Sequence, residues 1–238
     1  MKILAMDSSG TVATAAIVED DSLLAEYTVN YKKTHSQTLL PMIDEIVRMT
    51  ELDLATIDAI AVASGPGSFT GLRIGSATAK GLGLALDKPI VEVPTVDALA
   101  CNLYDTPGLI CPIMDARRNQ VYTGVYRFEN HSLVTIRESF AESIEALCGL
   151  LNEFGEPVTF LGDGVPVFGD RIVGMLQVPC SFAPAHLARQ RAGAVGTLGL
   201  RMYKEGRFCT AAEHRPDYLR PSQAERERAE REKAKQEK

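Results

Sequence analysis

A weak internal repeat constrains the fold of this chain more than any other feature. An apolar segment ends at Asp7, and a polar turn and two further strand-like segments follow it. A second apolar segment ends at Asp115 and is followed by the same succession of turns and strands. Each half then continues with helix, strand and helix, so a β-β-β-α-β-α order occurs twice. The sequence therefore predicts an α/β protein with two similar lobes, residues 1–104 and 105–221, and a charged tail, residues 222–238.

Composition excludes several functional classes. The chain has 238 residues, of which 45% are hydrophobic and 24% charged, as in ordinary globular proteins with a large core. A net charge of −6 and the absence of Trp argue against nucleic-acid binding by the chain as a whole, although a local basic patch stays open. The five Cys are scattered without a C-x-x-C pair, which argues against a disulfide framework or a zinc site. Because no signal-peptide pattern or membrane-length apolar run occurs, we expect a cytoplasmic protein with reduced thiols and no membrane contact.

A Gly-rich segment, Ala63–Gly75, joins a predicted buried strand to a predicted helix at residues 69–86. Glycine-rich turns at such a junction often bind phosphate. Here the glycines follow G-x-G-x-x-x-G, one residue longer than the dinucleotide fingerprint, and the Lys of a P-loop is missing. The pattern therefore argues against phosphate binding at this turn.

Small residues recur at every fourth position of the predicted helix, at Gly71, Gly75, Ala79 and Gly83. On a helix this spacing places them on one face, and each Gly costs up to about 1 kcal/mol of helix stability relative to Ala. Such a stripe indicates close approach of another backbone. The approaching element is either a neighbouring helix of the same domain or a helix of another chain.

Five sequence blocks in one order resemble a single bacterial protein family. They are MDSSG at the start, His35–Asp44, Ser64–Gly75, Pro112–Tyr122 and Pro216–Pro221. Together they resemble the TsaB family, also called YeaZ, of tRNA threonylcarbamoyladenosine biosynthesis proteins. With the repeated unit, the resemblance implies the two-lobed α/β fold of the actin/Hsp70/sugar-kinase (ASKHA) superfamily.

The resemblance also implies a function without catalysis. TsaB-like proteins resemble degenerate relatives of TsaD, the subunit that transfers a threonylcarbamoyl group to N6 of adenosine 37 in tRNAs reading ANN codons. The chain is then expected to be a scaffold that pairs directly with TsaD, and with a second copy of itself when alone. The ATPase TsaE and the tRNA would join through the complex. Pairing in this family implies contacts through the helix with the small-residue stripe and the preceding helix, with predicted interface residues Leu39, Ile43, Gly71, Gly75, Ala79 and Gly83.

The sequence keeps only one of the two hairpin turns that would bind the phosphates of a nucleotide. The first turn, Asp7-Ser8-Ser9-Gly10-Thr11, suits phosphate binding, because Asp7 could orient a metal-bound water and Gly10 lets the backbone come close. It also suits an ordinary hairpin turn. In the second turn Arg117 and Arg118 stand where small residues are needed, and Asp163 in a later loop would repel a phosphate. We therefore expect no cofactor on this chain alone, with a nucleotide at the junction with TsaD as the alternative.

No metal site is expected. TsaD-like enzymes hold a metal through an H-x-x-x-H pair, and the matching positions here are Thr95 and Leu99. The four His are never three or four residues apart, and His35 is expected to cap or pack. Arg117 and Arg118 favour surface or partner contact over direct tRNA contact.

Two other functions remain open at this point. One is an ATP-dependent enzyme of the same fold, such as a small-molecule kinase or an ATPase, which would require phosphate turns in both halves. The other is a homodimeric tRNA-binding module, against which the pI of about 5.3 counts.

Overall fold

The computed structural model describes residues 1–31 and 34–219 and confirms two lobes of equivalent topology. The charged tail predicted at residues 222–238 lies outside the described residues. Each lobe contains a five-stranded sheet, with the order β3-β2-β1-β4-β5 in the N-terminal lobe and β8-β7-β6-β9-β10 in the C-terminal lobe. The two orders correspond strand by strand, so the repeat in the sequence is a repeat in the structure.

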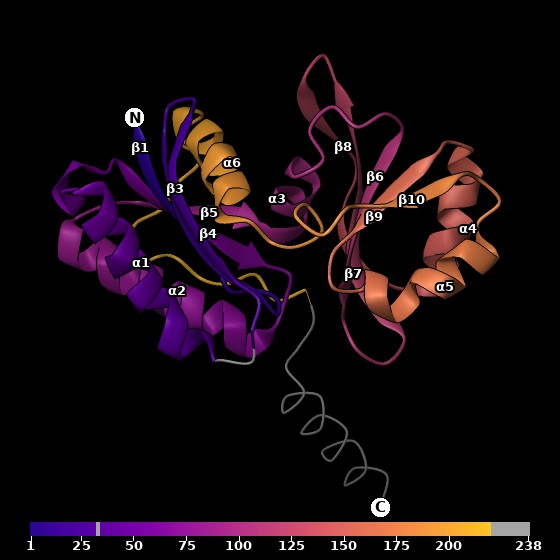
Figure 1. The fold of residues 1–238 in the computed structure, drawn as a ribbon, viewed down its shortest axis with the longest axis horizontal. Coiled ribbons are helices and arrows are strands. Elements are labelled where there is room, and N and C mark those ends of the chain that lie inside the picture. The colour runs from indigo at the N-terminus through magenta and orange to yellow at the C-terminus, as the bar shows by residue number, and fades with distance from the viewer. Residues whose placement is uncertain (32–33, 220–238) are drawn as a thin grey trace, which may run out of the picture.

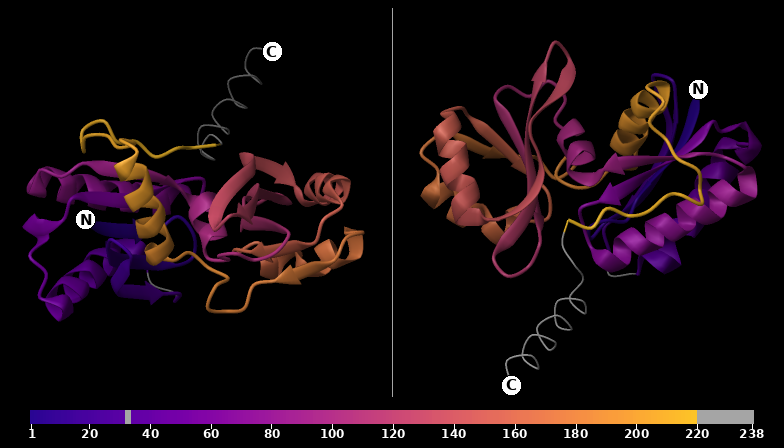
Figure 2. Two further views of the ribbon diagram at one scale, coloured as in Figure 1. Left: turned by 90° about the horizontal axis from the view of Figure 1, so that it is seen from above. Right: turned by 180° about the vertical axis from the view of Figure 1, so that it is seen from behind.

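The sheet of the N-terminal lobe is covered on both faces. Its strands are β1 (Lys2–Asp7), β2 (Ala13–Glu19), β3 (Ser22–Val29), β4 (Ala59–Gly65) and β5 (Ile90–Pro94). β1 pairs antiparallel with β2 and parallel with β4, and a short 3-10 helix, Leu54–Thr56, precedes β4. Helices α1 (His35–Thr50) and α2 (Phe69–Leu86) lie on one face and α6 (Ala192–Lys204) lies on the other (Figures 1 and 2).

The two covered faces explain why β1 is apolar throughout. Successive side chains of a strand point to opposite faces of the sheet. Ile3 and Ala5 pack in the core below α6, whereas Leu4 and Met6 pack in the core below α1 and α2. A strand buried on both faces reads as a continuous apolar run rather than an alternating one.

The C-terminal lobe repeats this plan with fewer helices. Its strands are β6 (Leu109–Asp115), β7 (Gln120–Glu129), β8 (Ser132–Ser143), β9 (Val158–Leu161) and β10 (Cys180–Phe182). Helices α4 (Ile144–Phe154) and α5 (Val165–Met175) pack beside one another. α3 (Thr95–Cys101) lies between the lobes, where it contacts β6, β7 and α6.

The predicted extent of the C-terminal lobe, residues 105–221, is wrong at its end. Helix α6 returns to the N-terminal lobe and packs against β1, β2 and β4. Residues 205–219, which we call the C-terminal strap, follow the same lobe toward the junction (Figure 2). Cys209 of the strap bridges to Ile90 of β5, and the amide of Asp217 donates to the carbonyl of Ser64 at 2.7 Å.

Helix α2 has the predicted bounds, but α6 begins later than predicted. The sequence pattern predicts a helix from about His186, whereas α6 begins at Ala192. The side-chain amide of Asn102 donates to the carbonyls of Leu187 (3.0 Å) and Arg189 (2.7 Å). These contacts hold the stretch before α6 against α3 in a non-helical conformation. No helix in the described part of the chain has the length and hydropathy that a membrane crossing requires.

Candidate functional site

A cavity of about 500 Å³ lies between the lobes and brings together turns from both halves of the sequence. Its lining includes the β1–β2 turn, the β4–α2 turn, the β6–β7 turn and residues Asp217–Leu219 of the strap. Ser9, Gly10 and Thr11 of the predicted nucleotide turn line the cavity, and Asp7 and Ser8 are buried. The two hairpin turns that the sequence repeat relates, β1–β2 and β6–β7, therefore meet at one cavity.

The β1–β2 turn is held in place by hydrogen bonds to its neighbours. The amide of Ser9 donates to Asp7 Oδ1 at 2.7 Å, and the Ser8 hydroxyl donates to the carbonyl of Gly71 at 2.9 Å. The amide of Ser68 donates to the carbonyl of Ser9 at 2.6 Å. His35 Nε2 donates to the carbonyl of Gly10 at 2.9 Å, which agrees with the packing role expected for this His. The turn therefore joins β1 to the first residues of α1 and α2.

Asp7 is the most perturbed carboxylate of the site. Burial raises its pKa to about 6, against the opposing effect of the hydrogen bonds from Ser9. Its second oxygen, Oδ2, is buried and has no hydrogen-bond partner among the described residues. An ionised carboxylate in this position costs stability near neutral pH.

Replacing Asp7 with Asn is expected to remove a pH-dependent loss of stability. Between the pKa of the unfolded chain and a folded pKa of about 6, the native state binds more protons, so the free energy of unfolding falls as the pH rises. Asp7→Asn keeps the Oδ1 acceptor and does not titrate. The free energy of unfolding of Asp7→Asn, relative to the natural chain, should therefore rise by up to about 3 kcal/mol from about pH 3.5 to about pH 7.5. Urea unfolding of both proteins at the two pH values measures this difference, and a constant difference would contradict it.

The β6–β7 turn closes on its own side chains. Arg117, Arg118 and Asn119 have consecutive left-handed backbone conformations, with φ of 64°, 55° and 62°. Asp115 accepts from the amide of Arg117 at 2.8 Å and pairs with its guanidinium at 3.1 Å. The two predicted anion-contact residues separate here, because Arg117 lines the cavity while Arg118 is exposed outside its lining.

The charge of the cavity lining does not match a phosphate. Three carboxylates, of Asp115, Asp163 and Asp217, line it with one described cation, Arg117, which Asp115 already neutralises. Asp163 also accepts from the amide of Asp115 at 3.0 Å, and burial together with the nearby Asp115 raises the pKa of Asp163. A phosphate group bound in this cavity would face mostly negative charge.

The predicted interface residues lie inside the N-terminal lobe, which corrects their assignment as contact residues. Leu39, Ile43 and Ala79 belong to the core between the helices and the sheet. A Cβ on Gly71 would overlap the carbonyl oxygen of Ser8, and one on Gly83 would lie 3.0 Å from Ala211 of the strap. The remaining member of the predicted set is Gly75, where a Cβ would lie 2.7 Å from the Ser8 hydroxyl.

The small-residue stripe does let another backbone approach closely, as predicted. The approaching segment is neither a helix of the same domain nor a helix of another chain. The stripe meets the β1–β2 turn at one end and the strap at the other, and neither is a helix. The surface that α1 and α2 present to solvent is formed by other residues, which we call the outer helix face. Its exposed members are Leu40, Asp44 and Arg48 of α1 and Arg73, Ala77, Gly81 and Leu84 of α2.

The outer helix face was missed because its leucines lie among other apolar residues in the sequence, beside Leu39 and between Leu82 and Leu86. Leu40 is 54% exposed and Leu84 is 68% exposed, although both lie in helices whose other apolar residues are mostly buried. α1 and α2 contact one another and lie side by side (Figure 1). The available signal was Leu84, because the residues three and four positions away from it are Lys, Gly, Asp and Lys.

Thr95 and Leu99 occupy the positions where TsaD-like enzymes are expected to carry their His pair. Leu99 packs into the apolar cluster between the lobes, beside Val96 and Met114. Thr95 is fully buried at the start of α3. Neither position offers an imidazole to a metal ion.

Comparisons with known proteins identify relatives over nearly the whole chain. The family model described as "TsaD: tRNA N6-adenosine threonylcarbamoyltransferase" matches residues 22–227. The tRNA threonylcarbamoyladenosine biosynthesis protein TsaB of Bacillus subtilis is 35% identical over 225 residues, which cover 94% of this chain and 96% of that protein. The TsaB protein of Escherichia coli is 32% identical over 135 residues, 56% of this chain and 58% of that protein.

A solved structure confirms the fold class. The structure of YeaZ from Pseudomonas aeruginosa superposes with a TM-score of 0.78 at 24% identity, over 92% of this chain and 99% of that chain. Together with the equivalent strand orders of the two lobes, this likeness confirms a two-lobed α/β fold shared with YeaZ.

Proposed function

The chain belongs to the TsaB family of tRNA threonylcarbamoyladenosine biosynthesis proteins, and on this premise we propose that it is a non-catalytic subunit that binds and activates a TsaD-type transferase. The product would be N6-threonylcarbamoyladenosine at position 37 of tRNAs reading ANN codons. TsaE and the tRNA would join through the complex, and free chains would pair with one another.

The observation that carries this proposal is the chemistry of the interlobe cavity. An ATP-dependent enzyme of this fold needs two phosphate-binding turns that face one another. Here the first turn is bonded to the starts of α1 and α2 through Ser8, Ser9 and Gly10. The second turn carries Arg117, which is paired with Asp115. These features support a role through binding rather than through turnover of a nucleotide.

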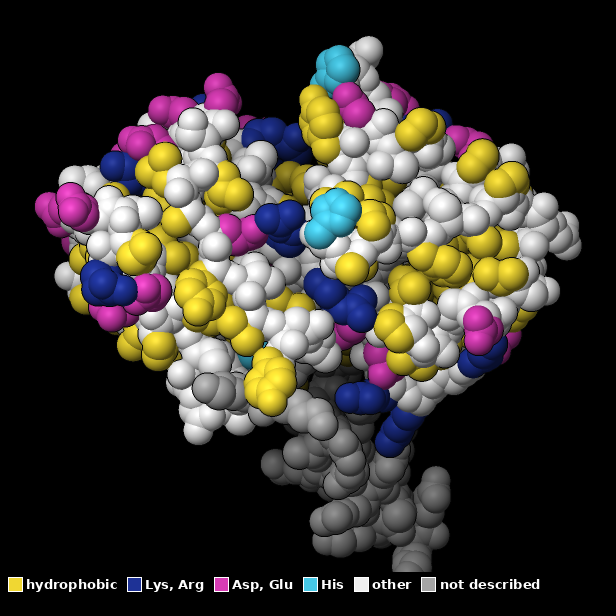
Figure 3. Space-filling model, viewed as in Figure 1, with side chains coloured by type: hydrophobic (Ala, Val, Ile, Leu, Met, Phe, Trp, Pro, Cys, Tyr) yellow, Lys and Arg dark blue, Asp and Glu magenta, His cyan; other side chains and the backbone are white. Residues whose placement is uncertain are grey.

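We assign the contact with the transferase to the outer helix face. Leu40 and Leu84 supply exposed apolar side chains at opposite ends of this pair of helices. Between them, the exposed residues Ala77 and Gly81 of α2 have no side chain larger than a methyl group. Small exposed residues let a partner helix approach closely, while large apolar residues supply the buried area of an interface. Hydrophobic side chains also occur on the C-terminal lobe, so exposure alone does not single out this face (Figure 3).

Light scattering after gel filtration, with and without TsaD of the same organism, tests the proposal. We expect the 25.8 kDa chain to be replaced by a species with the mass of a one-to-one complex. Arg117 and Arg118 are expected to be surface or partner contacts in that complex, without binding tRNA on the isolated chain. If no complex forms with or without ATP and TsaE, while the isolated chain hydrolyses ATP, the enzyme alternative replaces the scaffold.

A further inference from the structure

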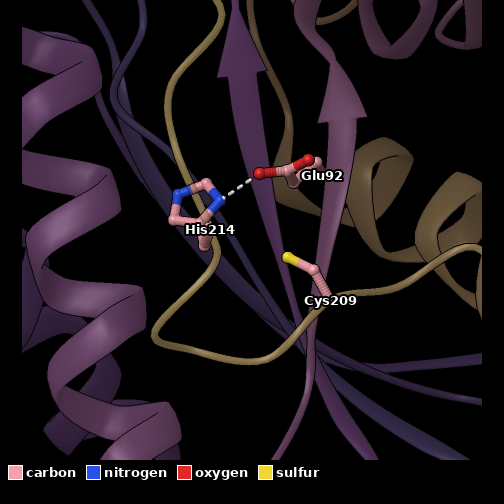
Figure 4. A group of neighbouring side chains, drawn as sticks. All are labelled: Glu92, Cys209 and His214. Carbon is pink, nitrogen blue, oxygen red and sulfur yellow. Dashed lines mark hydrogen bonds and ion pairs between the residues drawn. The ribbon is translucent and has the colours of Figure 1, made fainter.

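The C-terminal strap brings two potential metal ligands, Cys209 and His214, beside a third, Glu92, on the edge strand β5 of the N-terminal sheet. Cys209 and Ile90 exchange two backbone hydrogen bonds of 2.9 Å, which sets the strap against the edge strand β5. Two residues beyond Ile90, Glu92 points toward His214, which the strap carries back to the sheet (Figure 4). The ligand atoms of Glu92, Cys209 and His214 all lie within 4.8 Å of one another.

The three side chains form a converging group rather than a surface scatter. His214 Nδ1 lies 2.7 Å from Glu92 Oε1, and the side chain of His214 is 1% exposed while that of Glu92 is 41% exposed. Glu92 Oε1 also accepts from the amide of Arg215 at 3.0 Å, so the carboxylate is held in place. The group is thus anchored on its buried side and open to solvent at the carboxylate.

We propose that Glu92, Cys209 and His214 bind one Zn²⁺ ion that clips the C-terminal strap to β5. Thiolate, imidazole and carboxylate are the three side-chain ligands that zinc prefers, and three protein ligands leave a fourth tetrahedral position for water. Ligand atoms around such an ion lie about 3.5 Å apart, so side-chain movement on the order of 1 Å closes the site. The scattered Cys gave no sign of it, because two of its ligands come from the strap and the third from β5.

Zinc binds the thiolate of a Cys and the neutral imidazole of a His, so binding releases the thiol proton of Cys209. The ring proton of His214 moves from Nδ1, which now faces Glu92 Oε1 at 2.7 Å, to Nε2.

Titration of the full, chelator-treated chain with ZnCl₂ tests the site. We expect one Zn²⁺ per chain, and Cys209→Ser should weaken binding by more than about 100-fold, beyond the roughly 10–100-fold that loss of an outer partner costs. Glu92→Gln keeps an acceptor for His214 and Arg215 and should weaken binding by at least about tenfold. The matched control is Cys180→Ser, because Cys180 is a partly exposed Cys on β10 of the other lobe. This variant should bind zinc with unchanged affinity.

Co²⁺ in place of Zn²⁺ gives a second readout that is independent of stability. A thiolate ligand produces a charge-transfer absorption, which Cys209→Ser should abolish and Cys180→Ser should retain. Absence of zinc binding by the natural chain would overturn the proposal, and so would equal affinity in Cys209→Ser. This outcome is separate from complex formation with TsaD, because the site lies on the isolated chain.

Discussion

Gly71→Ala is expected to destabilise the N-terminal lobe by about 3 kcal/mol, at the upper part of the usual range for overpacking. A Cβ at this position would overlap the carbonyl oxygen of Ser8, which is backbone and has little freedom to move. The turn that contains Ser8 is further tied to the start of α2 through the hydrogen bond from the Ser68 amide to Ser9. The lobe can accept the methyl group only by displacing this turn or the helix. Urea unfolding followed by circular dichroism measures the change.

Gly81→Ala on the same helix is the matched control. A Cβ at Gly81 has no neighbouring atom within 4 Å, so only helix propensity changes. The substitution should raise the free energy of unfolding by up to about 1 kcal/mol. Equal stability of the two variants, with loss of TsaD binding only in Gly71→Ala, would return the small-residue stripe to the role of a partner surface.

Leu84→Glu is expected to weaken the complex with TsaD by at least about 30-fold, the effect of losing one interface hot spot of about 2 kcal/mol. Leu84 is largely exposed in the free chain, so the charge costs little in the monomer, but it would be desolvated at an apolar interface. Leu40→Glu on α1 should act in the same direction, because both leucines belong to the outer helix face. Isothermal titration of TsaD with each variant gives the dissociation constants.

Val173→Glu on α5 is the control for this second prediction. Val173 is 58% exposed, similar to Leu40 and Leu84, but lies on the C-terminal lobe. It should bind TsaD as the natural chain does. If Val173→Glu lost the complex while both leucine variants kept it, the docking surface would belong to the C-terminal lobe. The same three variants, measured without TsaD, show whether self-association uses the same face.

Local patterns in the sequence were sufficient for most of the elements and their order, but they missed the short strand β10. The hydrophobic periods predicted the repeated β-β-β-α-β-α unit, and the bounds of α2 agree with those in the structure. The sequence blocks that resemble TsaB proteins led to the family that the comparisons confirm. Such features depend on residues close to one another along the chain, and their spacing is visible without a structure.

The sequence patterns did not show which distant segments of the chain cover each element. The spacing of Gly71, Gly75, Ala79 and Gly83 showed that they share a helix face, but not that the β1–β2 turn and the strap cover it. The return of α6 to the first sheet was missed for a similar reason, since a helix signal does not state which sheet it will cover. Both errors concern contacts between segments far apart in sequence.

The sequence by itself determined the two-lobed plan, the family and the missing His pair. Each of these follows from which residue types occur at fixed short spacings along the chain. Only the tertiary structure decided which apolar residues stay exposed, how the charges of Asp115, Asp163 and Asp217 gather around one cavity, and that Glu92 meets Cys209 and His214. These juxtapositions arise when burial of both faces of the first sheet draws α6 and the strap back across the chain. The free energy that favours the packing of α6 and the strap on the first sheet comes from many contacts across the core. No single sequence motif therefore predicts it.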